Sequence, residues 1–359
     1  MKQTTRRISK RTEKKRNFIS LFIFSAVVIV SVIHFSRNAS LSEWYMNKIY
    51  PSVATFLSTI SSLFPFSVYD VFIVIAVLYL LKLILFVIIR QTSFKSFLFS
   101  LVRFVTILIA WFYFGWGISY FRKDYYSRTN IQETTFNATN LREFASHFIS
   151  QANNSYVEFE VMEKEEIRKE IERTYSHVHE PLVLNYPNGK RRAKKMIFES
   201  MFTKMGISGY YGPFFNEIHI NNYSLNFTYP FTLAHEMAHQ FGIAKESEAN
   251  LYAFIVCANS EDERIRYSAY VSVISYLLND VRALIPDEYE EILNSVKPEI
   301  IEDLQRNRQH WLSARNETLS DVQNKAYDAY LKGNRISSGR ENYSEVVGLL
   351  ISSRVLYSN

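Results

Sequence analysis

Residues 228–254 read TYPFTLAHEMAHQFGIAKESEANLYAF, and this stretch decides how the chain is interpreted. Pro230 suits the first turn of a helix and Gly242 suits a helix end, so the two residues frame a helix of about three turns. On that helix His235 and His239 are four residues apart and project from the same face. Both imidazoles can therefore bind one metal ion.

Glu236 lies between the two histidines and completes the pattern HExxH. Cys257 is the only cysteine, so a metal must be held by histidines and carboxylates. A zinc ion bound in this way keeps one position for water and lowers the pKa of that water toward about 7. Glu236 would take a proton as the water attacks a carbonyl carbon and pass it to the leaving amine. The pattern predicts one Zn2+ ion, Glu236 as catalytic base, and a peptide or protein substrate.

The third metal ligand is expected from the acidic residues that follow Gly242. The glycine allows a reversal that folds a second helix back on the first. If that helix begins near Ala244, Glu246 and Asn250 share a face, which places a carboxylate at the metal and an amide behind a histidine. We therefore prefer Glu246 as the third ligand and Asn250 as the residue that orients a histidine, while Glu248 stays open as the alternative ligand.

A purely structural helix is the competing interpretation, because HExxH specifies only three positions. The apolar residues around the motif argue against it by predicting a buried helix, namely Leu233, Ala234, Met237, Ala238 and Phe241. Burying two histidines and a glutamate without partners would be unfavourable. The alternative function is a catalytically inactive HExxH module, tethered to the membrane, that serves binding or assembly.

A short strand is predicted at residues 216–221, where NEIHIN alternates polar and apolar residues, and GYYGP at 209–213 predicts a turn before it. An edge strand beside a zinc-binding helix can pair with an extended substrate. The residues assigned to this substrate-binding strand are Phe215, Glu217, His219 and Asn221. The ring of His219 itself is expected to face solvent.

Three tyrosines are candidate oxyanion stabilisers, namely Tyr210, Tyr211 and Tyr267. The chain contains 24 tyrosines. Packing or surface positions are therefore the competing interpretation for each of them.

Three apolar stretches, residues 18–35, 68–89 and 97–120, reach the length of roughly twenty residues that a helix needs to cross a membrane. Residues 41–66 are also apolar, but they contain Pro51 and Pro65 and are rich in Ser and Thr. We expect them to form an interfacial helix or a re-entrant segment, with a fourth span as the alternative.

The distribution of positive charge predicts the orientation. Eight Lys and Arg residues occur among the first sixteen, and Arg90 and Lys95 lie between the second and third apolar stretches. Because such residues favour the cytoplasmic face, the chain is expected in membrane lipids with its N-terminus cytoplasmic and its C-terminal domain outside the cytoplasm. Arg122 and Lys123 argue modestly the other way. The absence of a basic stripe elsewhere in the sequence argues against a nucleic-acid partner.

The fold is expected to be mainly α, with three N-terminal transmembrane helices and then a mostly helical, zincin-like α+β domain with a short sheet. The regions are a basic cytoplasmic leader at 1–17, a membrane domain at 18–120 and an extracytoplasmic metallopeptidase domain at 121–359. Helical periodicity marks residues 141–151 and 163–175 within the last region.

HEMAHQFG at 235–242 and KESEANLYAF at 245–254 also support a family resemblance. Four further stretches extend it, namely PFSVYD at 65–70, GISGYYGPFFNEIHIN at 206–221, RYSAY at 266–270 and YLKGN at 330–334. On these stretches the chain resembles domain-of-unknown-function family 3810, a family of uncharacterised membrane proteins. The resemblance implies a membrane setting in Gram-negative bacteria of the Bacteroidota type and no established substrate. With the orientation expected above, this means the bacterial inner (cytoplasmic) membrane and a periplasmic C-terminal domain.

The motif is more distantly similar to that of gluzincin peptidases. In those enzymes HExxH is followed by a glutamate ligand and, four residues later, by Asp or Asn. This similarity implies the set His235, Glu236, His239, Glu246 and Asn250. The chain departs from the gluzincin pattern in its short interval before Glu246, since gluzincins place the third ligand farther downstream.

Overall fold

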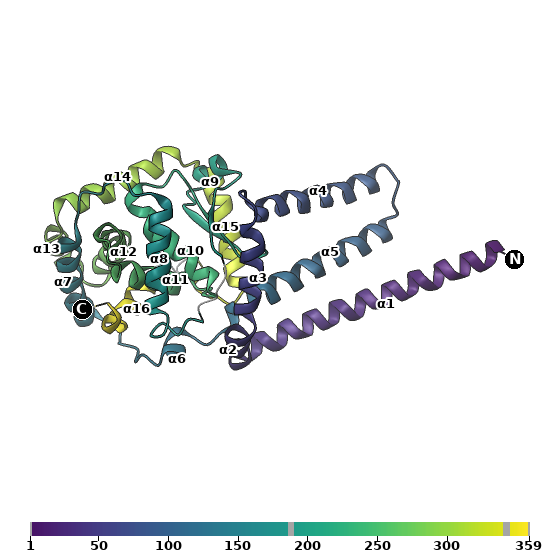
Figure 1. Cartoon of the computed structure of the whole chain (residues 1–359), viewed down its shortest axis with the longest axis horizontal. Helices are drawn as coiled ribbons and strands as arrows, with labels where there is room; N and C mark the ends of the chain where they lie inside the picture. Colours follow the sequence, from purple (N-terminus) through teal and green to yellow (C-terminus); the bar gives the residue numbers. More distant parts are fainter. Residues whose placement is uncertain (1, 186–189, 340–344, 358–359) are drawn as a thin grey trace.

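Three long helices project from one end of a helical body in the computed structural model, which describes residues 2–185, 190–339 and 345–357 (Figure 1). The N-terminus and the loop between the other two projecting helices lie at the far end, away from the body (Figure 1). The projecting helices are α1 (Lys2–Arg37), α4 (Val68–Ile88) and α5 (Phe94–Gly115).

The projecting helices contain three segments that are long and apolar enough to cross a membrane, Arg16–Arg37, Val68–Ile88 and Phe94–Gly115. Only 6%, 0% and 6% of their most apolar windows is buried inside the protein. Helices that expose apolar residues on all sides require a lipid environment. The chain is therefore a membrane protein, and three spans were correctly predicted.

Most of residues 41–66, expected to form an interfacial helix or a re-entrant segment and not a fourth span, folds into α2 (Ala39–Lys48) and α3 (Tyr50–Ser62). Helix α3 lies between the projecting helices and the body, across the direction of the spans (Figure 1). The segment contributes Tyr45, Met46 and Tyr50 to a buried cluster that also contains Trp116. It is therefore packed onto the body and forms part of its core.

The body consists of helices from the rest of the chain. They are α6 (Tyr125–Thr129), α7 (Ala138–Ser155), α8 (Lys164–Val178), α9 (Glu199–Met205), α10 (Tyr229–Gln240), α11 (Glu246–Ala258), α12 (Glu263–Leu284), α13 (Tyr289–Asn294), α14 (Pro298–Ala314), α15 (Glu317–Gly333) and α16 (Val346–Ser352). Short 3-10 turns occur at η1 (Gly117–Phe121), η2 (Asn226–Thr228), η3 (Pro286–Glu288) and η5 (Arg354–Leu356). Helices α7 and α8 confirm the two predicted helical segments. Helix α7 is longer than predicted at both ends, and α8 is longer at its C-terminal end.

Helices α10 and α11 form the centre of the body and pack against each other and against α12. Nearly every side chain of α10 and α11 is buried, including the charged ones. An interior helix that carries charge needs specific partners for that charge. The polar residues of these two helices are therefore the place where a functional site is to be sought.

The sheet has three short strands, β1 (Ala193–Lys194), β2 (Gly209–Gly212) and β3 (Glu217–Ile220), in the order β1-β3-β2. The prediction of a strand at 216–221 is confirmed by β3. The predicted turn at 209–213 was wrong, because residues 209–212 pair antiparallel with β3 in a continuous ladder. The reversal occurs just after it, where Asn216 adopts a left-handed φ of 53°.

A buried lysine on β1 fastens the turn between α3 and α4. The ammonium of Lys194 donates to the backbone carbonyl of Ser61 at 2.8 Å and to that of Phe66 at 3.1 Å. Carbonyl groups at the C-terminal end of a helix attract a cation. Lys194 therefore holds the end of α3 to the sheet.

A buried glutamate on β3 holds the start of α4 in a complementary way. The carboxylate of Glu217 accepts hydrogen bonds from the backbone N–H of Val68 at 3.2 Å and of Tyr69 at 2.8 Å, and it lies 3.5 Å from Lys194. Burial raises the pKa of Glu217, but the contacts with His219, the Tyr69 amide and Lys194 outweigh burial and lower it below 4.5. The second membrane span is thereby fixed to the sheet by a buried ion pair.

Replacing Glu217 by Gln should destabilise the protein, because Lys194 would remain buried without its carboxylate. We expect a loss of about 3 to 5 kcal/mol, and therefore a thermal unfolding midpoint lower by roughly 6 °C or more for the detergent-solubilised full chain. Because folding lowers the pKa of Glu217, its contribution is complete above pH 4.5 and declines as the pH falls below that value. The difference between the wild type and Glu217→Gln should shrink over the same range.

Glu158→Gln is the control, since Glu158 is exposed. Equal unfolding midpoints for the wild type, Glu217→Gln and Glu158→Gln would show that the buried pair does not hold the span to the sheet.

Candidate metal centre

Helix α10 carries the HExxH residues and has the ends that the sequence predicted. It begins at Tyr229 with Pro230 in its first turn, and Gly242 follows its end with a φ of 85°. A Cβ on Gly242 would lie 2.6 Å from the terminal carbon of Met46, so the position requires glycine for both space and conformation. The reversal at Gly242 brings α11 back along α10.

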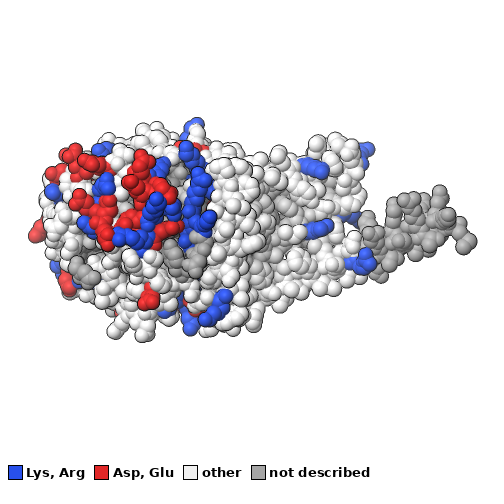
Figure 2. Space-filling view, in the orientation of Figure 1, with Lys and Arg blue, Asp and Glu red and all other residues white. Residues whose placement is uncertain are grey.

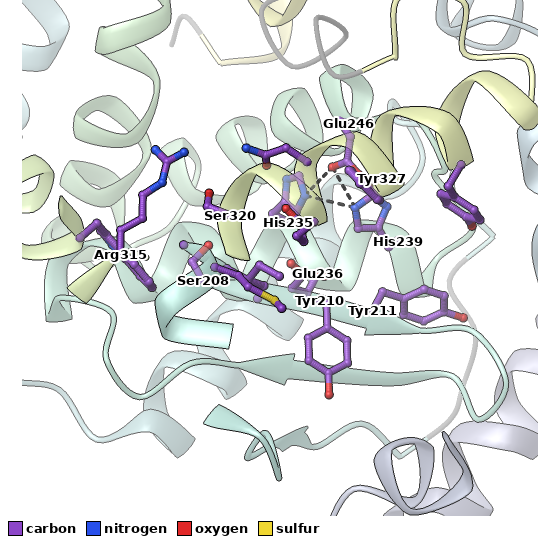
Figure 3. Close-up of a pocket in the computed structure, with 18 of the residues that line it drawn as sticks. Ser208, Tyr210, Tyr211, His235, Glu236, His239, Glu246, Arg315, Ser320 and Tyr327 are labelled. Carbon is purple, nitrogen blue, oxygen red and sulfur yellow. Dashed lines mark hydrogen bonds and ion pairs between the residues drawn. The ribbon is translucent and has the colours of Figure 1, made fainter. Parts of the chain in front are cut away.

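The side chains of His235, His239 and Glu246 meet in the interior between these two helices (Figure 3). Nε2 of His235 lies 3.0 Å from Oε2 of Glu246 and 3.1 Å from Nε2 of His239. Nε2 of His239 lies 3.3 Å from the same carboxylate oxygen. These residues form the one group of three or more potential metal ligands found among the described residues.

The spacing of the three ligand atoms fits one small divalent ion. Zinc binds nitrogen and oxygen ligands at about 2.0 to 2.1 Å, and tetrahedral ligands at that distance are about 3.3 Å apart. The observed separations of 3.0 to 3.3 Å are close to this value. The triad thus offers two imidazole nitrogens and one carboxylate oxygen and leaves a fourth position toward the neighbouring cavity.

The ring of His239 is oriented for this role by the turn that follows α10. Its Nδ1 donates a hydrogen bond to the backbone carbonyl of Ile243 at 2.7 Å, which leaves Nε2 free to coordinate. Nδ1 of His235 is buried without a hydrogen-bond partner in the described part of the chain. The sequence had assigned Asn250 to orient a histidine, and that assignment was wrong. Its amide bonds to neither histidine and interacts with Tyr276 instead, because α11 turns it toward α12.

The three ligand groups attract positive charge to the point where they meet. Burial lowers the pKa of His239, but the carboxylate of Glu246 outweighs burial and raises that pKa to about 9. Burial likewise raises the pKa of Glu246, whereas the two histidines hold it well below 4.5. A divalent cation would satisfy the same electrostatic demand.

Glu236 is buried beside the triad but does not bond to it. Its Oε2 has no hydrogen-bond partner among the described residues, and burial raises the pKa of the carboxyl to about 7. Gly209 of β2 makes room for it, since a Cβ there would lie 2.7 Å from Oε1 of Glu236. The carboxyl group lies between β2 and the triad, at the wall of the cavity (Figure 3).

Segments next to the membrane hold the C-terminal end of α10. The indole of Trp116, directly after α5, donates to the carbonyl of His239 at 2.8 Å. The hydroxyl of Tyr50 on α3 donates to the carbonyl of Gln240 at 2.7 Å. The His239 carbonyl also accepts from the backbone N–H of Gly242 at 2.9 Å. The two side-chain donors add to this local bond and tie the helix end that carries His239 to the segments next to the membrane.

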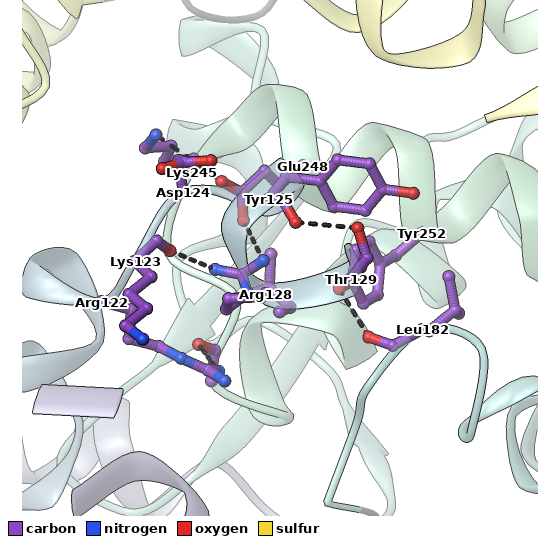
Figure 4. A network of polar contacts seen from close by, with 12 residues as sticks. Arg122, Lys123, Asp124, Tyr125, Arg128, Thr129, Leu182, Lys245, Glu248 and Tyr252 are labelled. Atoms are coloured by element: carbon purple, nitrogen blue, oxygen red, sulfur yellow. Dashed lines mark hydrogen bonds and ion pairs between the residues drawn. The ribbon is translucent and has the colours of Figure 1, made fainter. Parts of the chain in front are cut away.

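The choice between Glu246 and Glu248 is decided by the geometry. Glu248 points away from the triad and pairs with the buried Arg128 at 2.5 Å, close to Lys245 and Tyr252 (Figure 4). Glu246 is the acidic residue of this segment that reaches the histidines. The preference for Glu246 therefore agrees with the structure.

None of the three candidate tyrosines directs its hydroxyl toward the triad. Tyr210 donates to Asp70 at the start of α4, and Tyr211 bonds to Asn216 at 2.8 Å (Figure 3). Tyr267 donates to Asp303 at 2.5 Å and does not line the cavity. These assignments were wrong, because each hydroxyl is already used to join elements of the fold.

The assignment of β3 as the substrate-binding strand was also wrong. β3 is the central strand and pairs on both sides, so it has no free edge along its length. His219, expected to face solvent, is fully buried with its Nε2 2.8 Å from Oγ of Ser67. Phe215 packs on Trp111, and Asn221 bonds to the Ile207 carbonyl. The four residues join the sheet to the membrane helices and to α9.

A cavity of about 800 Å³ opens beside the triad. Its walls come from β2 and the residues before it, from α14 and α15, and from the segment that follows α5. The lining includes Glu236, all three ligands and the aromatic residues Trp116 and Tyr120. A substrate in this cavity would touch both the metal centre and the membrane-proximal segment.

The family model described as "Protein of unknown function (DUF3810)" matches residues 45–351. The chain belongs to the DUF3810 family. No curated protein and no solved structure matches it.

Tyr327 is a residue of the DUF3810 site that the sequence reasoning missed. It lies on α15 and donates its hydroxyl to Oε1 of Glu246, the oxygen not directed at the histidines. The ring stacks on Tyr330, with centroids 6.0 Å apart. The nearest signal in the sequence was the YLKGN stretch at 330–334, one turn farther along the helix.

Metal analysis of the purified full-length DUF3810 chain should give one ion per chain. Glu246→Gln should weaken metal binding by roughly tenfold or more, because it removes an anionic ligand. Glu248→Gln should keep the metal although it breaks a buried ion pair, so it controls for general destabilisation. Equal metal content in the two variants would exclude Glu246 as the third ligand.

Tyr327→Phe should weaken metal binding by roughly tenfold while one ion per chain still binds at saturation, because the variant loses only the hydroxyl that orients Glu246. Titration with a competing chelator measures the difference. Tyr330→Phe is the matched control one turn away, and unchanged affinity in Tyr327→Phe would show that the hydroxyl has no role at the metal.

Proposed function

We propose that this DUF3810 protein is a membrane-anchored zinc metallopeptidase. The observation that carries the proposal is the buried triad of His235, His239 and Glu246 with the unpaired carboxyl of Glu236 next to it. Two imidazoles and one carboxylate are a ligand set typical of catalytic zinc, which keeps a position open for water. Zinc bound there would lower the pKa of water and polarise a carbonyl group.

Glu236 is the residue best placed to move protons. Its pKa of about 7 suits a group that accepts a proton from water in the cavity and returns it to a leaving amine. The unsatisfied Oε2 contributes nothing visible to the fold, and burying it is unfavourable for stability. Both facts favour an active enzyme over a catalytically inactive HExxH module.

Peptide substrates are favoured by the strand that lines the cavity. β2 pairs with β3 along one edge, and no other described strand pairs with its second edge. Gly209 and Tyr210 of β2 line the same cavity as Glu236. An extended peptide can add to such an edge and present its backbone carbonyl groups in register.

The surroundings of the cavity favour substrates close to the membrane. Trp116 and Tyr120 line it and follow directly after the third span. The N-terminus and the loop with Arg90 and Lys95 lie together at the opposite end of the spans (Figure 1). By the positive-inside rule this arrangement supports a body outside the cytoplasm, which in a bacterial inner membrane would be the periplasm. Arg122 does not oppose this, because it is buried in an ion pair with Glu43 at 2.7 Å.

Glu236→Gln should abolish peptide hydrolysis while leaving zinc bound. The loss of a general base lowers the rate by roughly 10² to 10⁴-fold. The full-length protein with one equivalent of zinc is incubated with a proteome-derived peptide library, and new peptide termini are measured by mass spectrometry. Undiminished cleavage by a Glu236→Gln protein of equal zinc content would refute the role of Glu236, and no cleavage by the wild type would refute the peptidase.

A reporter enzyme that is active only outside the cytoplasm should be active when fused after residue 359. A second reporter, active only in the cytoplasm, should be silent at that position and active in the loop at Arg90. The reverse pattern would place the catalytic body in the cytoplasm.

A further inference from the structure

Helix α14 presents one continuous face to the cavity beside the metal centre. Arg308, Trp311, Leu312 and Arg315 all line the cavity. The spacing of three and four residues places Arg308, Trp311 and Leu312 along one side of α14, and Arg315 is the residue that directly follows the helix. Two cationic side chains thus flank an apolar centre. The exposed fraction of Leu312 is 54%, so this apolar surface is open to a ligand.

Neither arginine forms an ion pair with a described residue. Arg306, on the same helix, pairs with Asp303 at 2.5 Å. Arg308 and Arg315 have no acidic group within the 4.0 Å limit for such a pair among the described residues. Their guanidinium groups are therefore available to a ligand.

Among the described residues that line the cavity, no acid is left over to neutralise the two arginines. Glu236 and Glu246 are the acidic residues among its described lining, and both belong to the metal centre. The α15 wall near Arg315 carries the neutral residues Ser320 and Gln323 (Figure 3). The end of the cavity next to α14 is therefore positively charged. It lies away from the triad but within the same cavity.

We propose that Arg308 and Arg315 recognise a carboxylate of the substrate, next to an apolar side chain that packs on Trp311 and Leu312. The inference rests on the proposed peptidase function and names the class of peptide that it takes. Guanidinium groups bind carboxylates through paired hydrogen bonds, which gives both affinity and orientation. The substrate is thus a peptide with an acidic group on one side of the bond that faces Glu236.

The carboxylate can come from the C-terminus of the peptide or from an Asp or Glu side chain, and the test separates the two sources. The full-length Glu236→Gln protein with zinc is immobilised in detergent, so that binding is measured without hydrolysis. Four pools of synthetic octapeptides share the same randomised apolar positions. The pools differ in the C-terminus, which is free or amidated, and in one residue, which is Gln or Glu. All four combinations of these two features are used.

We expect the pools with a carboxylate to be retained roughly tenfold more than the amidated Gln pool. Preference for the free C-terminus with Gln identifies the terminal carboxylate, and preference for the amidated Glu pool identifies the side chain. Adding Arg308→Gln and Arg315→Gln should reduce the ratio to about one. Arg306→Gln, the control on the same helix, should leave the ratio unchanged, and zinc content and unfolding midpoint should be the same in all variants.

Equal retention of charged and neutral pools, an unchanged ratio in the double arginine variant, or retention of no pool would each overturn the proposal. Its failure is distinct from that of the peptidase. If the protein prefers carboxylates but the wild type cleaves no peptide, the arginine site is supported and the peptidase function is refuted. If the wild type cleaves peptides but shows no carboxylate preference, the peptidase function is supported and the arginine site is refuted.

Discussion

The structure depends on three polar atoms that lie within 3.3 Å of one another between two largely buried helices. Two imidazoles and a carboxylate at these distances need a shared positive charge. Much of the local architecture follows from this requirement. The reversal at Gly242 brings α11 against α10, and the hydroxyl of Tyr327 holds the second oxygen of Glu246.

The membrane helices and the metal centre are connected by hydrogen bonds at several points. Trp116 and Tyr50 bond to the last turn of α10, while Lys194 and Glu217 fix the turn between α3 and α4 to the sheet. Because β2 of that sheet also positions Gly209 against Glu236, the wall of the candidate site and the second span share one support. On the visible face, charged residues gather on the part of the body away from the projecting helices, and the coloured part of the projecting helices shows few charged residues (Figure 2).

Local patterns in the sequence were enough to predict the parts of the fold that local interactions determine. The three spans, the ends of α10 and the pairing of His235 with His239 depend on apolar runs, on Pro230 and Gly242, and on helical spacing. The sequence also favoured Glu246, since its position after the reversal follows from the same spacing.

The remaining errors concern contacts between residues far apart in the chain. Residues 209–212 look like a turn by composition, but pairing with β3 outweighs the preference of the glycines. His219 carries a polar ring that suits solvent, yet Ser67 from a distant membrane helix buries it. No local pattern marks Tyr327, because its partner lies 81 residues earlier and meets it only in the folded molecule.

The hydrogen bonds from Trp116 and Tyr50 to α10 limit where the chain can be cut to produce a soluble fragment. A soluble fragment cut just after residue 120 would lose both donors to α10, together with Tyr45 and Met46 from the cluster they share. The cut would remove one hydrogen-bond donor from each of two carbonyl groups at the end of α10 and would expose apolar side chains to water. The membrane segment and α10 therefore support each other, and the anchor is a wall of the candidate site as well as a means of staying at the membrane.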